Sequence, residues 1–308
     1  MRVLLTGATG FVGSHVLGRL VRDGEHAVAI VLRSVRPPWR IEPYLGRVEV
    51  VAGDLDRAAE LVEPVRRFAP NVVVHLAWGN VADRDRAVLG QVDDAVRTVE
   101  LVKLAHAAGA AHFVGLGSQA EYGPCPGPID ETQLPRPVTP YGTAKLCAGL
   151  LGEQVAAALG LRWAWLRLFS AYGPMDAPRY LIPSVCRALL AGERPALTRG
   201  EQIWDFVYVA DAADAIVRVA CEPAARGVMN LGSARPVTIR HVVERLRDLV
   251  RPGAELGFGE VAYRADQIMH LEANVDRLRQ ATGWQPVTDL DTGLERTVAW
   301  HRKAGEPS

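Results

Sequence analysis

Tyr141 and Lys145 are the pair of side chains in this 308-residue sequence that is best suited to acid–base chemistry. They are four residues apart in the stretch PYGTAKLCAGLL, and residues at that spacing share one face of a helix. Pro140, directly before them, is typical of a first helical turn. An adjacent ammonium group favours the anion of a phenol. The pair therefore predicts a tyrosine that exchanges a proton near neutral pH, although an ordinary helix face would have the same spacing.

A serine at the end of an apolar segment could complete this pair. Ser118 follows residues 112–116, which we predict to be a strand. Ligands of open α/β sheets bind at the carboxyl ends of the strands. We therefore predict that Ser118, Tyr141 and Lys145 converge in one site.

Three glycines in the stretch LLTGATGFVGSHVLGRL predict a dinucleotide nearby. Gly7, Gly10 and Gly13 lie between a short apolar segment and a helical pattern. In such a strand-to-helix turn the first glycine permits the tight turn, the second lets the backbone approach a pyrophosphate, and the third lets the helix pack against the strand. The N-terminus of the helix then faces the phosphates.

The end of the second predicted strand bears on which dinucleotide is bound. A dinucleotide-binding turn is commonly followed, about 20 residues later, by an acidic residue that binds the adenosine ribose. This chain has AIVLRSVR there, with Arg33 and Arg36 and no carboxylate. A guanidinium group suits the 2′-phosphate of NADP through charge-assisted hydrogen bonds. We predict NADP(H) in preference to NAD(H); the alternative is that Arg33 is an ordinary solvated arginine.

The elements that must position these residues follow a regular alternation. Short segments rich in β-branched residues alternate with segments of helical length, which is typical of a parallel sheet covered on both faces. After about Phe169 the alternation ends, and helical stretches such as Ile239–Val250 predominate. The predicted strands are residues 3–6, 27–32, 48–51, 72–76, 112–116 and 163–168.

This pattern predicts an α/β protein with two interleaved regions. The first is a Rossmann-type, doubly wound domain made of residues 1–168 and about 203–228. The second is a smaller, mostly helical substrate-binding region made of residues 169–202 and 229–308, again with approximate bounds.

The composition excludes several classes of protein. Because 35 basic and 35 acidic residues balance, there is no net field to attract nucleic acid or an anionic membrane. No segment has the pattern of a signal peptide or a membrane-spanning helix. The four cysteines are scattered without metal-ligand spacing. We expect a reduced cytoplasmic protein with no metal.

Further motifs accompany the glycines and the Tyr-Lys pair, in one order along nearly the whole chain. They are Gly53-Asp54-Leu55, His75-Leu76-Ala77, Ser118 with Glu121-Tyr122-Gly123, RLFSAYGP and DFVYVAD. Together the motifs resemble the extended short-chain dehydrogenase/reductases, the NAD-dependent epimerase/dehydratase family. That resemblance implies a Rossmann core, a nicotinamide dinucleotide and a nucleotide-activated sugar as substrate.

The resemblance also implies roles for individual residues. Tyr141 would be the acid and base, Lys145 would hold the nicotinamide ribose, and Ser118 would hydrogen-bond the reacting oxygen. The other positions expected at the cofactor are Thr9, Phe11, Val12, Asp54, Leu55, Leu76 and Ala77.

Gln119 and Ala120 bear on the type of reaction. In the sugar-nucleotide 4,6-dehydratases of this family an Asp-Glu pair follows the residue that matches Ser118, because eliminating water needs its own acid and base. The related decarboxylases use a glutamate nearby. Gln119 and Ala120 cannot take a proton in that role. Hydride transfer at a sugar carbon remains, as either reduction of a keto group or epimerisation.

The stretches SQAEYG, RLFSAYGP and YRADQIMHLEANVDRLRQATGWQP look like 4-ketoreductases of nucleotide-linked deoxysugars. A reductase consumes NADPH, whereas an epimerase commonly keeps NAD. We therefore predict NADPH-dependent reduction of the C4 keto group of a nucleotide-diphosphate 4-keto-deoxysugar, with Tyr141 as the proton donor. The alternatives are a 4-epimerase with tightly bound NAD and a non-catalytic dinucleotide-binding regulator.

The positions expected to bind the substrate diphosphate depart from the family pattern. Ser170 stands where many members have asparagine, and Trp204 where many have arginine. Arg264 matches the other diphosphate arginine, and Arg179 is a further candidate. Trp204 would stack on a base or sugar, or fill the core. With Ser118, Gln119 and Ala120, these residues form the expected substrate site.

Two helical stretches predict the oligomeric state. Residues 94–108 and the helix that begins at Tyr141 carry wide apolar faces. In the family the matching helices form a four-helix bundle between two subunits. We predict a homodimer.

Overall fold

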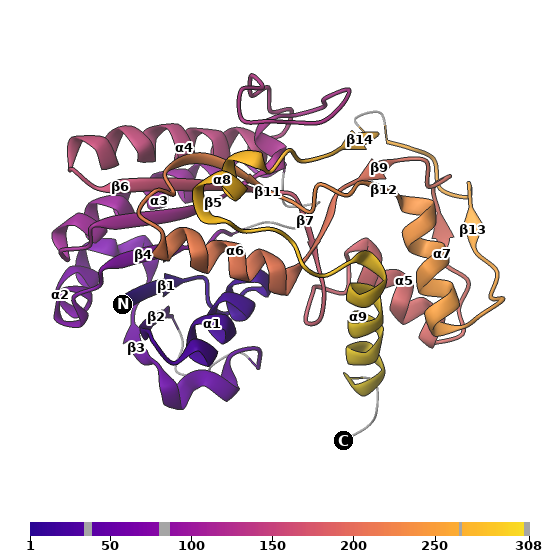
Figure 1. The fold of residues 1–308 in the computed structure, drawn as a ribbon, viewed down its shortest axis with the longest axis horizontal. Helices are drawn as coiled ribbons and strands as arrows, with labels where there is room; N and C mark the ends of the chain where they lie inside the picture. Colours follow the sequence, from indigo (N-terminus) through magenta and orange to yellow (C-terminus); the bar gives the residue numbers. More distant parts are fainter. Residues whose placement is uncertain (34–38, 80–86, 265–266, 305–308) are drawn as a thin grey trace.

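Within the part of the chain that the computed structural model describes, residues 1–33, 39–79, 87–264 and 267–304, seven strands form the central sheet (Figure 1). Every neighbouring pair of strands is parallel. The predicted doubly wound parallel sheet is thereby confirmed. In order across the sheet the strands are β11 (Gly227–Leu231), β6 (Arg162–Leu168), β5 (His112–Ser118), β4 (Val72–His75), β1 (Arg2–Thr6), β2 (Ala27–Leu32) and β3 (Glu49–Ala52).

The six strands predicted from the sequence are all present. β2 has the predicted bounds, and β5 continues two residues further than predicted, to Ser118. β11 was not among the predicted strands. Its sequence, GVMNL, begins with a glycine at φ 76° and contains the buried polar residue Asn230. Such a segment lacks the continuous apolar run that marks a buried parallel strand.

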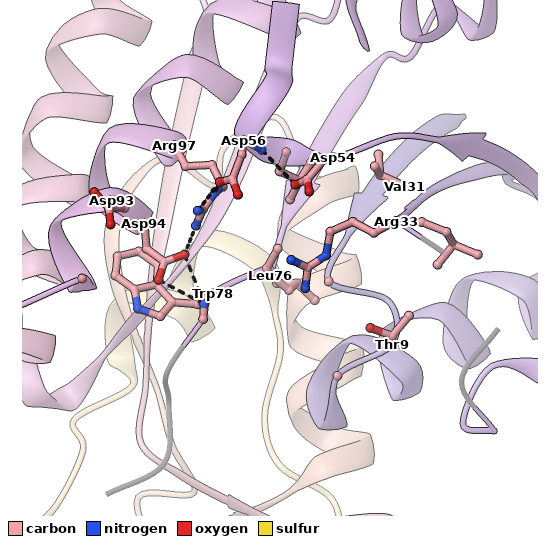
Figure 2. Close-up of a pocket in the computed structure, with 17 residues that line it drawn as sticks. Thr9, Val31, Arg33, Asp54, Asp56, Leu76, Trp78, Asp93, Asp94 and Arg97 are labelled. Carbon is pink, nitrogen blue, oxygen red and sulfur yellow. Dashed lines mark hydrogen bonds and ion pairs between the residues drawn. The ribbon is translucent and has the colours of Figure 1, made fainter. Parts of the chain in front are cut away.

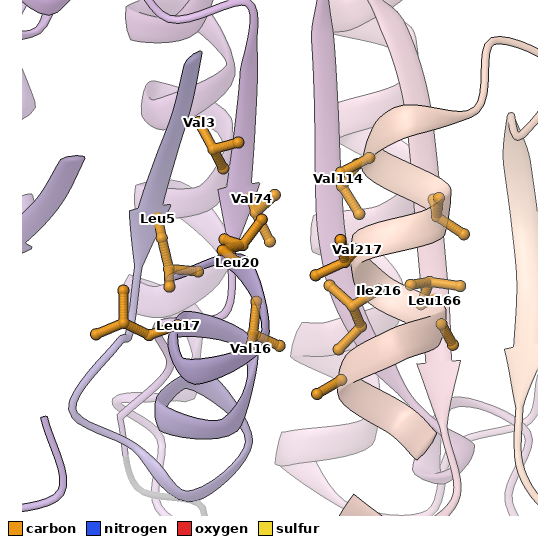
Figure 3. Packing of buried hydrophobic residues seen from close by; sticks show 14 of the residues in the cluster. Val3, Leu5, Val16, Leu17, Leu20, Val74, Val114, Leu166, Ile216 and Val217 are labelled. Atoms are coloured by element: carbon orange, nitrogen blue, oxygen red, sulfur yellow. The ribbon is translucent and has the colours of Figure 1, made fainter. Parts of the chain in front are cut away.

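Helices cover both faces of the sheet (Figure 1). On one face lie α1 (Phe11–Asp23) and α6 (Val209–Cys221), and on the other α2 (Ala58–Phe68), α3 (Gln91–Ala107) and α4 (Pro140–Ala158). Figure 3 shows the first layer, where apolar side chains of the sheet strands pack against those of α1 and α6. Burial of each such side chain stabilises the fold by about 1.5–3 kcal/mol relative to exposure.

A second group of elements lies beside the sheet, at the right of Figure 1. Its core is formed by α5 (Leu181–Leu190), α7 (Ile239–Val250) and α9 (Leu290–Ala304), and α7 has the predicted bounds. The short strands here are β7 (Ser170–Tyr172) with β10 (Phe206–Tyr208), β8 (Ala196–Leu197) with β13 (Gly257–Phe258), and β9 (Ile203–Trp204) between β12 (Val237–Thr238) and β14 (His270–Leu271). A short helix, α8 (Asp276–Thr282), packs on β11.

The strand pairings of β9 and β11 are relevant to where the two regions of the chain begin and end. β9 pairs with β12 and β14, and β11 continues the large sheet to Leu231. The division into two regions near residues 168, 203 and 228 remains our proposal. Among the described residues, no helix is long and apolar enough to cross a membrane. All four cysteines are unpaired.

Candidate active site

The glycine turn joins β1 to α1. Gly7 has φ 74°, and a Cβ at this position would lie 2.5 Å from the backbone nitrogen of Ala77. A Cβ at Gly13 would collide with the carbonyl oxygen of Gly7. Gly10 precedes α1 and supplies no side-chain cap, so the first backbone N–H groups of the helix stay available to an anion.

A cavity of about 750 Å³ opens at this turn, by the carboxyl ends of β1, β2 and β4 (Figure 2). Its volume falls within the range of about 300–1,000 Å³ typical of ligand pockets. Together with the turn that only glycine can form, the cavity fits a dinucleotide. Of the residues predicted at the cofactor, those that line it are Gly7, Thr9, Gly10, Arg33, Asp54, Leu55, Leu76 and Ala77. Phe11, Val12 and Gly13 follow in α1.

Arg33 and Asp54 both line one end of this cavity. Figure 2 shows the Arg33 side chain reaching across that end toward Leu76. The Asp54 carboxylate accepts a hydrogen bond of 3.1 Å from the backbone N–H of Asp56, at the start of a short 3-10 helix, η2 (Leu55–Arg57). A ligand at this end of the cavity would therefore meet both a guanidinium group, that of Arg33, and a carboxylate, that of Asp54. Arg36 lies outside the described residues.

Several residues at the other end of the cavity were not identified from the sequence. They include Trp78, Asp94 and Arg97 (Figure 2). Arg97 forms ion pairs with Asp94 and with Asp56 of η2, so it joins α3 to η2. Trp78 could have been found as the residue that follows His75-Leu76-Ala77. The i,i+3 spacing on α3 is a local signal for the pairing of Arg97 with Asp94, whereas nothing local in the sequence connects Arg97 to Asp56.

Ser118, Tyr141 and Lys145 come together at the carboxyl end of β5. Ser118 is the last residue of β5, and the other two lie in the first turns of α4, where the Thr139 hydroxyl caps the helix. The Lys145 Nζ donates a hydrogen bond of 2.6 Å to the carbonyl oxygen of Leu116 on the same strand. Ser118, Tyr141 and Lys145 are all buried.

Trp78 connects this trio to the dinucleotide cavity. The Lys145 Nζ lies 3.7 Å from the centre of the Trp78 ring, and the Tyr141 ring meets the same indole edge to face at 6.2 Å. The indole N–H donates a hydrogen bond of 2.8 Å to Gln91 Oε1, at the start of α3. The ring face therefore stabilises the buried ammonium group through a cation–π contact.

Burial is the main influence on the pKa of Lys145. It lowers the pKa of the ammonium group from 10.5 to about 7, although the carboxylates of Glu121 and Asp94 favour the charged form.

His75, on the neighbouring strand β4, has a pKa lowered to about 3, mainly by burial and then by the charge of Lys145. Its ring lies between the hydroxyls of Thr6 and Thr98, at 2.7 and 3.2 Å. His75 is thus a neutral link between elements.

Gln119 and Ala120 continue directly from Ser118 into a 3-10 helix, η4 (Gln119–Glu121). The Gln119 Oε1 atom is buried and has no hydrogen-bond partner among the described residues. A Cβ at Gly142 would collide with the Ala120 carbonyl oxygen, so a glycine there lets α4 approach η4 closely. Gln119 and Ala120 therefore lie beside the Ser118, Tyr141 and Lys145 trio.

The other predicted substrate residues lie on the second group of elements. Ser170 begins β7 and pairs with Phe206 of β10. The Trp204 indole N–H donates a hydrogen bond of 3.2 Å to the Ile268 carbonyl oxygen. Arg179 and Arg264 are exposed on connecting segments. None of these four residues is among those that line the dinucleotide cavity in the described part of the chain.

Comparisons with known proteins agree with this architecture. The model of the family "NAD dependent epimerase/dehydratase family" matches residues 3–232. The UDP-glucose 4-epimerase of Azospirillum brasilense is 31% identical to this chain, over 98% of the chain and 92% of its own length. The dTDP-glucose 4,6-dehydratase of Salmonella typhimurium (strain LT2) is 25% identical over 98% of the chain and 92% of its own length.

A solved structure extends the likeness to the fold. MoeE5 in complex with UDP-glucose and NAD matches with a TM-score of 0.85 and 29% identity, over 99% of each chain. The resemblance to the extended short-chain dehydrogenase/reductases is confirmed, and the chain belongs to the NAD dependent epimerase/dehydratase family.

Proposed function

We propose that this chain is a 4-epimerase of a nucleotide-diphosphate sugar that keeps NAD as its cofactor. The observation that carries the proposal is the Ser118, Tyr141 and Lys145 trio at the end of β5, beside a cavity fit for a dinucleotide. A relative named UDP-glucose 4-epimerase is similar over almost the whole chain. This reaction now takes precedence over the NADPH-dependent 4-ketoreductase that the sequence led us to expect.

The chain's own residues would supply the proton chemistry. When bound, the nicotinamide dinucleotide accepts a hydride from the sugar carbon and returns it. Tyr141 takes the proton of the C4 hydroxyl, Ser118 hydrogen-bonds the same oxygen, and the Lys145 charge stabilises the Tyr141 phenolate. The 4-keto sugar then presents its opposite face, and Tyr141 gives the proton back. One trio suffices because both half-reactions use the same oxygen.

Gln119 and Ala120 support this reaction over dehydration. Loss of water from a sugar needs an additional acid and base close to the reacting carbons. Neither an amide nor a methyl group can transfer a proton at neutral pH. The dTDP-glucose 4,6-dehydratase of Salmonella typhimurium is similar in sequence, but its reaction is not the one proposed for this chain.

We propose that the sugar nucleotide lies between the trio and the second group of elements. Arg264 and Arg179 would hold its diphosphate through charge-assisted hydrogen bonds, and Ser170 and Trp204 would complete the site. Both arginines are exposed, which leaves them accessible to such a ligand.

NADPH-dependent 4-keto reduction is the second candidate, and Arg33 is the observation that favours it. Its guanidinium group lines the cavity at the end of β2, where it could pair with a 2′-phosphate. MoeE5, in contrast, is described with NAD. Replacement of Arg33 by aspartate should erase any use of NADPH by repelling that phosphate.

One set of assays separates these candidates. The purified protein is incubated with a panel of nucleotide-diphosphate hexoses without added cofactor, and the product is identified by NMR. Formation of the 4-epimer supports the first proposal. Consumption of NADPH with 4-keto sugar nucleotides, without interconversion of epimers, supports the second. Activity in neither assay would contradict both and favour the non-catalytic regulator.

We also propose that the chain forms a homodimer through α3 and α4. Four apolar side chains on these helices are more than half exposed: Val92, Val96, Leu150 and Leu151. Covering them would remove apolar surface from water. Light scattering at micromolar concentration tests this, and a monomer mass would contradict it.

A further inference from the structure

A buried ion pair lies next to Ser118. Glu121 is fully buried, Arg167 of β6 is 5% exposed, and Arg167 Nε donates a hydrogen bond of 2.7 Å to Glu121 Oε2. Removing both charges from water offsets most of their attraction, and well-packed apolar residues often serve as well. Stability alone therefore does not account for the pair.

The second oxygen of Glu121 is bound by residues of β5 and β6. Oε1 accepts hydrogen bonds from the backbone N–H of Ser118 at 2.8 Å and from the Trp165 indole N–H at 3.0 Å. The Ser118 Oγ in turn accepts a hydrogen bond of 3.1 Å from the backbone N–H of Ala120. This reciprocal capping box, at the start of η4, fixes both the backbone and the side chain of Ser118.

Gly117 makes this arrangement possible. A Cβ at Gly117 would collide with Glu121 Oε1 and with the Trp165 indole nitrogen. On the other side of the indole, a Cβ at Gly149 of α4 would lie 3.0 Å from the same nitrogen. The glycines near Ser118 thus leave room for the Glu121 carboxylate and for the Trp165 indole that binds it.

The capping box also determines what the Ser118 hydroxyl can do. A hydroxyl has one proton to donate and two lone pairs to accept with. Because Oγ already accepts the Ala120 N–H, its own proton remains for a ligand oxygen. Donation to an oxygen that gains negative charge is the contribution expected of this residue.

We propose that Glu121 is a positioning residue, which holds Ser118 so that its hydroxyl donates to the reacting oxygen of the sugar. Arg167 and Trp165 orient the Glu121 carboxylate and have no contact with the reaction themselves. The catalytic part of this inference rests on the proposed function, because Glu121 acts only through Ser118.

Two double variants test the proposal without leaving a charge unpaired. Glu121→Gln with Arg167→Met keeps an oxygen acceptor for the Ser118 N–H. Glu121→Leu with Arg167→Met removes that acceptor at similar side-chain volume. The two proteins thus differ only in the residue opposite Ser118, and circular dichroism with thermal melting checks that both fold.

The glutamine variant should keep kcat within about threefold of the parent, an ordinary mutational scatter. The leucine variant should lose about 10- to 100-fold in kcat, part of the effect of losing an oxyanion donor. In both, KM and the cofactor Kd should change by less than about threefold, since neither substitution touches those ligands. Equal kcat values for the two variants, whether high or low, would overturn the proposal.

Hydrogen exchange at the Ser118 amide gives a readout that does not depend on turnover. Exchange followed by NMR should be slow in the parent and in the glutamine variant, and faster in the leucine variant. Equally slow exchange in the leucine variant would overturn the positioning role. A parent that converts no sugar nucleotide would contradict the proposed function, while amide exchange would still decide whether Glu121 holds Ser118.

Discussion

The dinucleotide cavity and the expected sugar-nucleotide site are built in different ways. The cavity lies at the ends of long parallel strands, and its main feature is a backbone turn that a Cβ would block. The residues expected at the substrate diphosphate lie on strands of two or three residues or on connecting segments; they are Ser170, Trp204, Arg179 and Arg264. On the proposed function, recognition of the cofactor would depend on backbone geometry, and recognition of the sugar nucleotide on individual side chains. Substitutions in the two regions should therefore affect different kinetic constants.

The largest effect is expected from Tyr141→Phe, which keeps the buried ring and removes the acid. We expect kcat to fall by about 10²–10⁴-fold, the range for loss of general acid–base catalysis. The cofactor Kd should be unchanged, which isothermal titration calorimetry can measure. A folded, cofactor-bound variant with the parental kcat, when chemistry limits the rate, would exclude Tyr141 as the acid.

Next in size is the effect of Gly7→Ala, with Gly24→Ala as its matched control. Both glycines have φ near 70°, but a Cβ at Gly7 meets the Ala77 backbone, whereas nothing lies within 4 Å of one at Gly24. We expect Gly7→Ala to weaken cofactor binding at least about 100-fold, or about 2.8 kcal/mol. Gly24→Ala should lower stability by about 1–2 kcal/mol and leave the Kd unchanged. Similar cofactor Kd values for the two variants would show that the glycine turn at Gly7 is not sterically constrained.

A smaller effect is expected in the sugar-nucleotide region, from Arg264→Ala. Loss of one charge-assisted hydrogen bond should raise KM about 10-fold and leave kcat within about twofold. Arg279→Ala, at an exposed arginine of α8, is the control and should change neither constant. If Arg264→Ala instead lowered kcat alone, the contrast between the two regions would not hold.

A further effect concerns pH and the protonation of Lys145. Its pKa is about 7 in the folded chain, against the ordinary 10.5, chiefly because of burial. From about pH 7 to pH 10.5 the unfolded chain holds a proton that the folded chain has released, so this group makes the free energy of unfolding rise with pH. Lys145→Met lacks that rise. Its stability relative to the parent should fall as the pH increases, measured by urea unfolding, and a constant difference would argue against a perturbed Lys145.

The sequence predicted well what local pattern determines. β2 and α7 have the predicted bounds because a continuous apolar run and a helical period each define them. The glycine turn was predictable because each glycine has its own steric reason, and the Tyr-Lys pair because helical spacing brings its members together. In contrast, β11 could not be recognised, since Asn230 interrupts it and its side chain is bound by the distant Tyr122 and Ile129.

The contacts that sequence could not predict join residues far apart in the chain. Glu121 and Arg167 are separated by 46 positions, and their pairing depends on the register of β5 beside β6. Arg97 of α3 forms an ion pair with Asp56 of η2, and both residues line the cavity. The expectation of a reductase rested on Arg33 and on three stretches that resemble 4-ketoreductases, whereas the relatives support the epimerase alternative better.

The most direct test of the account follows the hydrogen at C4. A nucleotide-diphosphate hexose labelled with deuterium at C4 is incubated with the protein, without added cofactor, and the product is examined by NMR. We predict that the 4-epimer forms with the deuterium still at C4, because the same cofactor takes and returns it, and that Tyr141→Phe abolishes the conversion. Loss of the label to solvent, or no epimer from any hexose in the panel, would contradict epimerisation by this site.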